Sequence, residues 1–325
     1  MYANNGAVFR ADISGVVVEA GTYEEGLIGA RVAPVVNVPT KDGQYPRFRL
    51  GTGNLLKREA NLNRAPGAHY ARGSLAYEQD TYATAEYGFE LPLDYVDRAD
   101  TSRFFDAAVI TADQAKRKIL LDYEIRVAEM TFNQTNYGTA TNSGTAYTLA
   151  NIATFDVGLD VDIAKGRLLS KGESDNALSV VMSRDVFTRI RASTKLQNRL
   201  RGIGVAADTI LQVDEQAVAE ALGVKEVLIG KNAYDTAAEG LAFSTDNIWN
   251  NTFIWIGRLG SAGTPAAMLN GGSQYTLNWS EYGPVLSVFE YEEPQSNSTV
   301  IRASQHVVEK VVNANAATLL ATQFA

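Results

Sequence analysis

A glycine-rich segment at 201–207 has the residue types of a nucleotide-binding loop. Its sequence, RGIGVAA, matches the pattern G-x-G-x-x-A through Gly202, Gly204 and Ala207. In a dinucleotide site these positions follow a buried strand and let the backbone approach a pyrophosphate at a helix N-terminus. The residues before Gly202 have the pattern of a helix or a basic loop instead. We therefore interpret the segment as a loop.

The other side chains that could do catalytic or metal chemistry are isolated in the sequence. The two histidines, His69 and His306, lie far apart, and neither belongs to a motif with a carboxylate. Asp160 begins a segment with two aspartates at calcium-loop positions, but residues that cannot bind the ion occupy the later ligand positions. No G-x-S-x-G elbow and no Walker loop occurs. The sequence predicts a protein that is not an enzyme and uses no cofactor or metal ion.

Composition and charge narrow the class of protein further. The chain has 325 residues, of which 46% are hydrophobic and 20% charged, so it can bury a substantial core. It contains no cysteine, which excludes disulfides and thiolate chemistry. The net charge of −8 disfavours general binding to DNA or RNA, because phosphate contacts need a basic surface. With neither a secretory signal nor a membrane-length apolar run, the chain is expected to be soluble and not secreted.

The longest helical pattern runs from Thr111 to about Gln134 and contains neither glycine nor proline. Thr111 and Gln114 form a capping box that predicts the start of this helix. Apolar residues recur along one face at intervals of three and four, at Ala115, Ile119, Tyr123, Val127 and Met130. The charged residues fall mostly elsewhere, at Lys116, Arg117, Asp122, Glu124 and Glu129. At 1.5 Å per residue the helix is about 35 Å long, so we expect it to be a spine on which other elements pack.

The elements around this helix indicate an α+β protein. Residues 1–37 resemble an extended arm, and 38–92 have the pattern of two strands joined by a wide, glycine-rich bend. Beyond a polar link after the spine, about 150–281 alternates predicted helices and strands, which indicates a second domain. The run from Thr299 to Ala314 is rich in β-branched residues and favours a long strand.

The charges of two distant segments are complementary. Between Gly43 and Tyr77 there is one acid, Glu59, against six bases: Arg47, Arg49, Lys57, Arg58, Arg64 and Arg72. From Leu259 to Ile301 there is no lysine or arginine, and the acids are Glu281, Glu290, Glu292 and Glu293. The two segments could pair within one molecule, but a protruding hairpin more naturally reaches a neighbouring copy.

The order of these elements resembles that of tailed-bacteriophage major capsid proteins of the Hong Kong 97-type fold. The resemblance rests on RAPGAHYARGSLAYEQDTYATAEYGFELPL at 64–93, TADQAKRKILLDYEIRVAE at 111–129, PAAMLNGGSQYTLNW at 265–279 and SVFEYEEPQSNSTVIRASQHVVEKVVN at 287–313. The resemblance covers nearly the whole chain and depends on the order and spacing of the elements. The implied parts are an N-terminal arm at 1–37, an extension loop at 38–92, a peripheral domain with the spine helix at 93–149, an axial domain at 150–281, and peripheral strands with a C-terminal tail at 282–325.

The resemblance implies a coat protein that assembles with itself as hexamers and pentamers. The icosahedral shell would enclose packaged double-stranded DNA without binding it sequence-specifically, as a virion capsid assembled in the host cytoplasm. Scaffolding, portal and decoration proteins would be the other partners, and no membrane is expected. Contacts between copies would join Arg47, Arg49, Arg58, Arg64 and Arg72 to Glu290, Glu292 and Glu293. Some members of this family crosslink a loop lysine to an asparagine of a neighbour, for which Lys57 and Asn313 are the candidates here.

Two other functions fit parts of the sequence. An encapsulin-like nanocompartment has the same fold but encloses enzymes instead of DNA. A cytosolic α+β enzyme would need a concave site with titratable groups of shifted pKa. Particles that contain DNA would exclude the first, and a monomer that binds a metabolite would favour the second.

Overall fold

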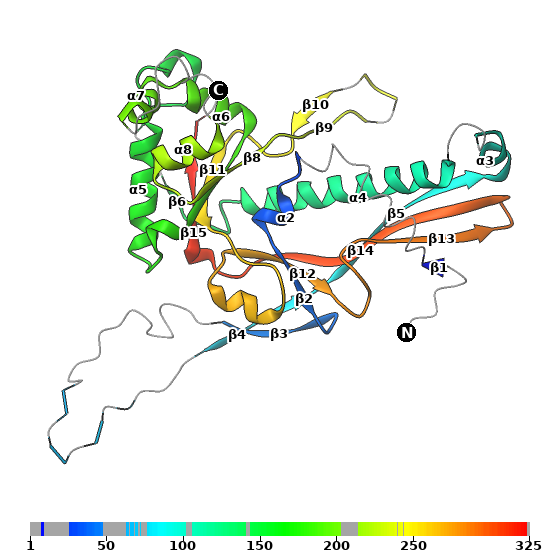
Figure 1. Cartoon of the computed structure of the whole chain (residues 1–325), viewed down its shortest axis with the longest axis horizontal. Coiled ribbons are helices and arrows are strands. Elements are labelled where there is room, and N and C mark those ends of the chain that lie inside the picture. The colour runs from blue at the N-terminus through cyan, green and yellow to red at the C-terminus, as the bar shows by residue number, and fades with distance from the viewer. Residues whose placement is uncertain are drawn as a thin grey trace.

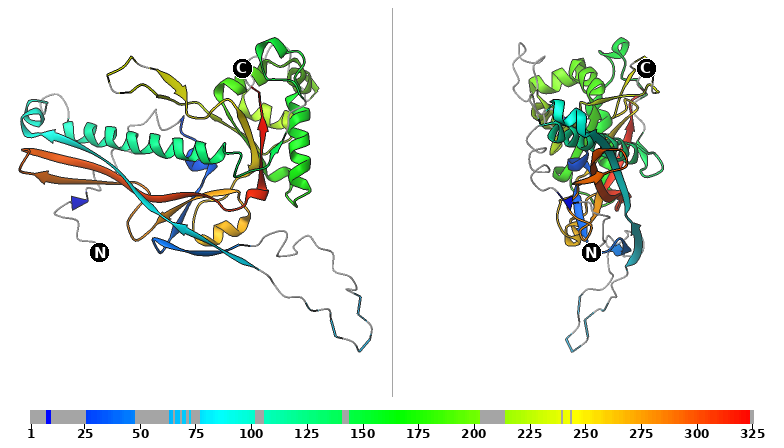
Figure 2. Two further views of the ribbon diagram at one scale, coloured as in Figure 1. Left: turned by 180° about the vertical axis from the view of Figure 1, so that it is seen from behind. Right: turned by 90° about the vertical axis from the view of Figure 1, so that its right-hand side faces the viewer.

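The chain is built around one long helix that follows one β-sheet and ends against a second (Figure 1). The computed structural model describes residues 8–9, 26–47, 63–64, 66–67, 69–70, 72, 77–101, 106–140, 144–202, 214–238, 240–242 and 244–323. A view along the long axis shows that the described part of the molecule is narrow (Figure 2).

The spine helix, α4, runs from Ala107 to Thr131 and begins earlier than the sequence indicated. Its N-cap is Asp106, whose carboxylate accepts a hydrogen bond from the Ala108 N–H at 3.0 Å. Thr111 therefore lies inside the helix, where its hydroxyl donates to the carbonyl oxygen of Ala107 at 2.8 Å. The capping box was wrong as a start signal because Asp106 caps the helix one turn upstream. The extra turn buries Ala107 and Ala108.

A six-stranded sheet supports the N-terminal half of α4. The strands are β1 (Val8–Phe9), β2 (Val35–Val38), β5 (Ala85–Asp94), β12 (Gln274–Trp279), β13 (Ser287–Glu293) and β14 (Ser298–Val311). β14 is the long strand expected from the sequence, and it pairs antiparallel with β5, β12 and β13. Ala112, Ala115 and Ile119 of α4 pack against this sheet, where they meet Val288, Ile301 and Ala303.

A five-stranded sheet receives the C-terminal end of α4. Its order is β6 (Thr139–Ala140), β15 (Ala317–Ala321), β11 (Phe253–Arg258), β7 (Leu178–Ser183) and β8 (Glu226–Gly230). Four helices pack with it: α5 (Val157–Leu169), α6 (Arg184–Ala192), α7 (Thr194–Gly202) and α8 (Glu215–Leu222). Every residue of β7 is buried, which agrees with the continuous apolar run that predicted this strand.

Each sheet contains strands from more than one of the sequence ranges that were expected to form separate domains. β12 lies within 150–281 but pairs with β14 of the six-stranded sheet. β15 lies within 282–325 but pairs with β11 of the five-stranded sheet. Because both strands cross over, the two sheets are joined by several chain connections.

The base of the expected extension loop is a hairpin of β3 (Asp42–Arg47) and β4 (Glu78–Ala83). The returning segment had the pattern of one strand, but the structure divides it at Thr84 into β4, which pairs with β3, and β5, which pairs with β14. Thr84 is buried and donates both its N–H (2.9 Å) and its hydroxyl (2.8 Å) to the Lys41 carbonyl oxygen. This anchor fixes the point at which the hairpin leaves the body of the protein.

Short elements complete the described part. They are α2 (Gly29–Val32), α3 (Tyr95–Thr101), β9 (Ala233–Asp235), β10 (Thr245–Asn247) and the 3-10 turns η2 (Leu149–Asn151), η3 (Asp175–Ala177), η5 (Pro265–Asn270) and η6 (Ala314–Ala316). β9 and β10 form a hairpin that projects from the five-stranded sheet along α4 (Figure 1).

Two charged residues that the helical pattern placed off the apolar face of α4, Lys116 and Glu124, are buried. Glu124 Oε1 accepts hydrogen bonds from the Ile28 N–H (2.9 Å) and the Trp249 indole N–H (2.7 Å), and its Oε2 accepts one from the Gly29 N–H (2.7 Å). Burial raises the pKa of the Glu124 carboxyl, and these three hydrogen bonds oppose that shift. One carboxylate thus joins the spine, the start of α2 and the segment that leads into β11.

A second link joins α4 to the six-stranded sheet. The Arg126 guanidinium lies over the Tyr87 ring, 3.5 Å from its centroid, and forms ion pairs with Asp122 (2.9 Å) and Glu309 (3.0 Å). Burial raises the pKa of the Glu309 carboxyl, and the charge of Arg126 opposes this shift. The pair of Asp122 and Arg126, and that of Asp113 and Arg117 at 2.7 Å, are ion pairs between residues four positions apart on the helix.

The contact between β11 and β15 depends on a glycine. A Cβ atom at Gly257 would lie 2.5 Å from the Ala317 Cβ and 2.8 Å from the Ala316 carbonyl oxygen. We expect Gly257→Ala to lower the free energy of unfolding by roughly 1–3 kcal/mol, because paired strands must separate to admit the methyl group. Urea unfolding of the unassembled protein measures the change. Gly166→Ala in α5 is the control, since open space surrounds its Cβ position and alanine favours helix; equal loss in both variants would contradict this account.

Candidate assembly interface

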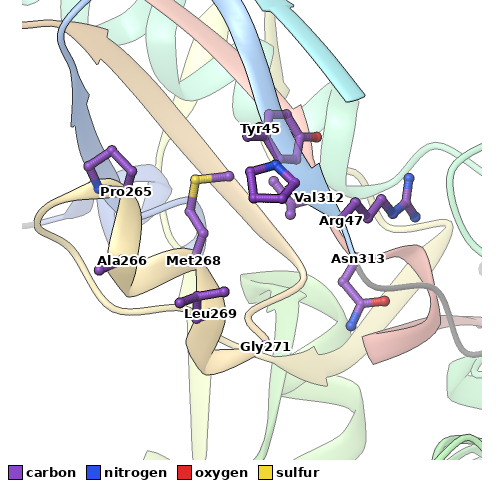
Figure 3. A pocket seen from close by; sticks show the side chains of 10 residues that line it. Tyr45, Arg47, Pro265, Ala266, Met268, Leu269, Gly271, Val312 and Asn313 are labelled. Atoms are coloured by element: carbon purple, nitrogen blue, oxygen red, sulfur yellow. The ribbon is translucent and has the colours of Figure 1, made fainter. Parts of the chain in front are cut away.

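A pocket of about 610 Å³ lies at the base of the β3–β4 hairpin (Figure 3). Three segments that are distant in the sequence form its walls: the end of β3, the turn η5, and the two residues that follow β14. The lining residues are Tyr45, Pro46, Arg47, Pro265, Ala266, Met268, Leu269, Gly271, Val312 and Asn313. The pocket therefore brings together two of the residues expected to act between copies, Arg47 and Asn313.

The η5 wall presents apolar side chains to solvent. Pro265 begins the turn, where the missing N–H of proline costs nothing, and Gly271 ends it in the left-handed conformation with φ of 78°. Between them, Leu269 is 68% exposed, whereas Met268 packs against the buried side chains of Tyr45 and Val312. An exposed leucine beside a pocket of this size marks a surface that another molecule could cover.

A polar network on the hairpin ties the pocket to the body of the protein. Asp80 on β4 accepts a hydrogen bond from the Tyr45 hydroxyl (2.9 Å) and from the Lys310 ammonium (3.0 Å), and Arg47 lies 3.6 Å away. Partial burial alone would raise the pKa of Asp80, but the hydrogen bonds from Lys310 and Tyr45 outweigh it and hold that pKa below its usual value. The network fixes the hairpin to β14.

Replacing Asp80 with asparagine is expected to loosen this attachment. Because the pair is partly exposed, we expect a loss of only about 0.5–1 kcal/mol at neutral pH. A carboxylate with a lowered folded pKa contributes stability above its unfolded pKa of about 4 and loses it as the pH falls through the folded value. Unfolding measured between pH 7 and pH 3 should thus be less pH-dependent in the variant. Asp42→Asn, at the exposed start of β3, is the control; equal pH dependence in Asp80→Asn and the natural protein would contradict the assignment.

The other basic residues of the expected extension loop lie in different surroundings from Arg47. Arg64 lies over the Tyr70 ring at 4.7 Å, and Arg72 is exposed. Arg49, Arg58 and Lys57 lie outside the described residues. Asn313 is half-buried, and its side-chain oxygen accepts a hydrogen bond from the Asn315 N–H at 3.1 Å as the N-cap of η6.

The acidic residues expected to meet these bases lie at the other end of the molecule. Glu292 and Glu293 are exposed at the turn between β13 and β14, which Figure 1 shows far from β3 and β4. Glu290 lies 3.8 Å from Arg98 of α3. Within this copy the described bases of the hairpin and the acids of β13 do not meet, so a contact between them requires two copies.

The residues considered first for nucleotide binding, metal binding or catalysis occupy structural positions in the fold. Gly202 ends helix α7, so no strand precedes the G-x-G-x-x-A pattern, and Gly204 and Ala207 lie outside the described residues. Asp160 is buried and accepts a hydrogen bond from the Tyr147 hydroxyl at 2.7 Å. His306 packs edge-on against the Trp279 ring at 5.0 Å. In the described ranges, no three histidines or acids are grouped to hold a metal ion, and no helix there has the length and hydropathy to span a membrane.

Sequence reasoning missed the residues that shape the pocket. Met268 and Leu269 carried a weak signal, an apolar pair between glycine-rich and small residues, but Asp80 and Lys310 carried none. They meet only because β4 and β14 are brought together by the fold, 230 residues apart. Nonlocal pairing of this kind cannot be read from local patterns.

Comparison with solved structures identifies the architecture. The chain matches a phage-related protein from Bordetella bronchiseptica RB50 with a TM-score of 0.68 and 18% identity, over 98% of both chains. It matches the capsid of the cyanophage P-SCSP1u with a TM-score of 0.56 and 13% identity, over 90% of this chain and 87% of that one. The capsid of an empty GTA particle matches with a TM-score of 0.54 and 16% identity, over 94% and 92%.

No family model and no curated protein matches the sequence. The likeness is therefore one of structure, and it extends over nearly the whole chain. This chain has the α+β, Hong Kong 97-type fold of tailed-phage capsid proteins, as the sequence resemblance predicted.

Proposed function

We propose that this chain is the major capsid protein of a tailed phage and that it assembles with itself into a shell. The observation that carries the proposal is the match to capsid structures over about nine-tenths of both chains. A fold can host several functions. The surface of this protomer gives a second line of support.

Large apolar side chains are exposed on separate parts of the protomer. Val96 on α3, Leu149 on η2, Leu241 beyond β9 and Leu269 on η5 are each about 70% exposed, at 70%, 69%, 71% and 68%. Single exposed apolar residues are common, but here four of them lie on four separate segments of the protomer. A coat subunit buries such positions on several neighbours at once, as heterologous contacts in a closed shell require.

In the proposed shell, hexamers and pentamers tile an icosahedron around packaged double-stranded DNA. Residues 150–281 would form the axial domain, and 93–149 with 282–325 the peripheral domain. The net charge of −8 supports a lining that does not grip DNA. Scaffolding, portal and decoration proteins would be the further partners, and assembly would take place in the host cytoplasm.

Charge pairing between copies is part of the proposal. Arg47, Arg49, Arg58, Arg64 and Arg72 of one hairpin would face Glu290, Glu292 and Glu293 of an adjacent copy. Charge reversal at Arg47 and Arg49 should weaken assembly, and reversal at Glu292 and Glu293 in the same protein should restore it. Unchanged assembly of the Arg47→Glu, Arg49→Glu variant would reject this pairing.

A covalent bond between the Lys57 and Asn313 side chains of different copies is a separate, optional step. Amide formation would release ammonia, which gives a mass change that mass spectrometry detects. Denaturing gels of assembled particles should show ladders of linked subunits, which Lys57→Arg should abolish. Particles that dissociate completely into monomers on these gels would exclude the covalent bond and leave the proposed shell unaffected.

Electron microscopy of the purified protein, beside its mass from light scattering, tests the proposed function. Both should be measured with and without a co-expressed scaffold. Shells, tubes or capsomer rings are expected, whereas a persistent 35.1 kDa monomer under all conditions would reject the proposal. Nuclease-protected DNA in particles from infected cells would support a phage coat, and enclosed enzymes would favour the encapsulin-like alternative.

A further inference from the structure

The axial part of the chain carries opposite charges on two neighbouring segments. Residues 184–202, which form α6 and α7, contain six arginines and lysines against one aspartate, a net charge of +5. Residues 214–247, which lead from α8 to β10, contain seven acids against two lysines, a net charge of −5. The whole chain has a net charge of −8, so this separation of positive and negative charge within one region requires an explanation.

Only part of the positive charge is used inside the protomer. Arg189 donates to the Tyr147 carbonyl oxygen at 3.0 Å, and Arg199 forms an ion pair with Asp162 at 3.2 Å. Four other cations, Arg184, Arg191, Lys195 and Arg201, have no ion-pair partner among the residues that the structure describes. We call the two of them that line one pocket, Arg184 and Arg191, the basic face.

A pocket of about 570 Å³ adjoins the basic face. Arg184 and Arg191 line one side of it, and Phe187 and Ile229 contribute buried apolar side chains. Lys231 and Glu215, also in the lining, neutralise each other at 2.8 Å. Asp214, the N-cap of α8, also lines the pocket and offsets part of the charge, so the two arginines leave the lining with a net positive charge.

The β9–β10 hairpin has the opposite character. No lysine or arginine occurs between Lys231 and Arg258, and Asp235 and Asp246 are exposed on the paired strands. Leu241, in the connection between the strands, is 71% exposed. Figures 1 and 2 show the hairpin projecting over α4, on the side of the five-stranded sheet away from α7.

We infer that the β9–β10 hairpin of one copy binds the basic face of the next copy. Asp235 and Asp246 would meet Arg184 and Arg191, and Leu241 would cover Phe187 and Ile229 in the pocket. Among the described residues, neither aspartate forms an ion pair with either arginine within one copy. Complementary surfaces that do not pair within a copy can make a heterologous contact, which generates a ring when the rotation closes. The inference rests on the proposed self-assembly, which supplies the second copy.

A second copy fits these observations better than a nucleic acid does. DNA phosphates would match the two arginines but not the apolar side chains of Phe187 and Ile229 in the same pocket. An acidic hairpin with an apolar tip matches both the arginines and the apolar floor. It also explains why the hairpin makes few contacts with its own copy beyond its base, where the Asn247 amide donates to Asp185 at 2.7 Å.

Charge exchange between the two surfaces tests the contact. We expect Arg184→Glu with Arg191→Glu to raise the protein concentration needed for assembly by about tenfold or more. Asp235→Asn with Asp246→Arg should have the same effect, since asparagine keeps the oxygen that accepts hydrogen bonds from the Ala237 and Ser244 N–H groups. The protein with all four changes should assemble nearly as well as the natural one. Lys118→Glu on the exposed side of α4 is the control and should assemble normally.

The possible results separate this contact from the proposed function. If the natural protein never assembles, the proposed function fails and the contact fails with it. If it assembles and the arginine variant does so equally well, the contact is rejected and the coat function stands. Normal shells of the arginine variant that lose only their DNA would overturn the contact in favour of a nucleic-acid surface. Thermal unfolding of each unassembled variant shows whether a defect in assembly is merely a defect in folding.

Discussion

Replacing Glu124 with alanine is expected to lower the free energy of unfolding by about 3–5 kcal/mol, among the largest effects of any single change in this chain. Three buried donors, the N–H groups of Ile28 and Gly29 and the indole N–H of Trp249, would lose their acceptor. Glu124 is only 1% exposed, so these donors are shielded from bulk water in the natural protein. Urea unfolding of the unassembled protein measures the loss.

The conservative variant Glu124→Gln separates charge from shape. Its amide nitrogen would face one of the three donors, so we expect about half of the loss seen with alanine. Since burial raises the folded pKa of Glu124, the natural protein should lose stability as the pH rises from about 4.5 through that folded value. Glutamine removes this pH dependence. Glu129→Gln, on the exposed side of α4, is the control, and an equally mild effect at both positions would contradict the assigned role.

Replacing Arg126 with alanine is the second change with a large expected effect. It leaves the Glu309 side chain, 8% exposed, as a buried charge without its partner, which typically costs 3–5 kcal/mol. It also removes the cation that lies over the Tyr87 ring. Without Arg126 the folded pKa of Glu309 rises further, so the variant should be least stable at neutral pH and recover as the pH falls through that pKa.

A second change in the same protein tests this explanation. Adding Glu309→Gln to Arg126→Ala removes the stranded charge and should restore at least half of the lost stability. Arg117→Ala, which breaks the exposed pair with Asp113, is the matched control and should cost no more than about 0.5 kcal/mol. If the double variant is no more stable than Arg126→Ala, the buried charge is not the cause.

Local sequence patterns predicted which helices and strands form better than they predicted where each one begins and ends. The spine helix and the long strand β14 are present where apolar periodicity and β-branched residues indicated them. The predicted helix start at Thr111 was wrong because Asp106 caps the helix more than one turn earlier. Which residue caps the helix depends on whether the alanines between them are buried, and the local sequence pattern does not show that burial.

Burial of charge was not predictable from the period of the helix. Glu124 directly follows the apolar Tyr123, so it lies beside the apolar face, and its environment depends on what packs there. Its partners come from segments 95 to 125 residues away in sequence. The same reason applies to the pocket at the extension hairpin, where Arg47 and Asn313 were candidates but Leu269 and Asp80 were not.

The position of β14 and β15 within the sheets has a consequence for synthesis of the protein. β14 is bordered by β5 on one edge and by β12 and β13 on the other, and β15 lies between β6 and β11. On the ribosome, neither sheet can close until residues 298–321 have emerged, so an interrupted chain keeps open strand edges and unpacked helices. A chain that stops before β15 is therefore expected to be less stable than the full chain and more prone to aggregate through its open strand edges.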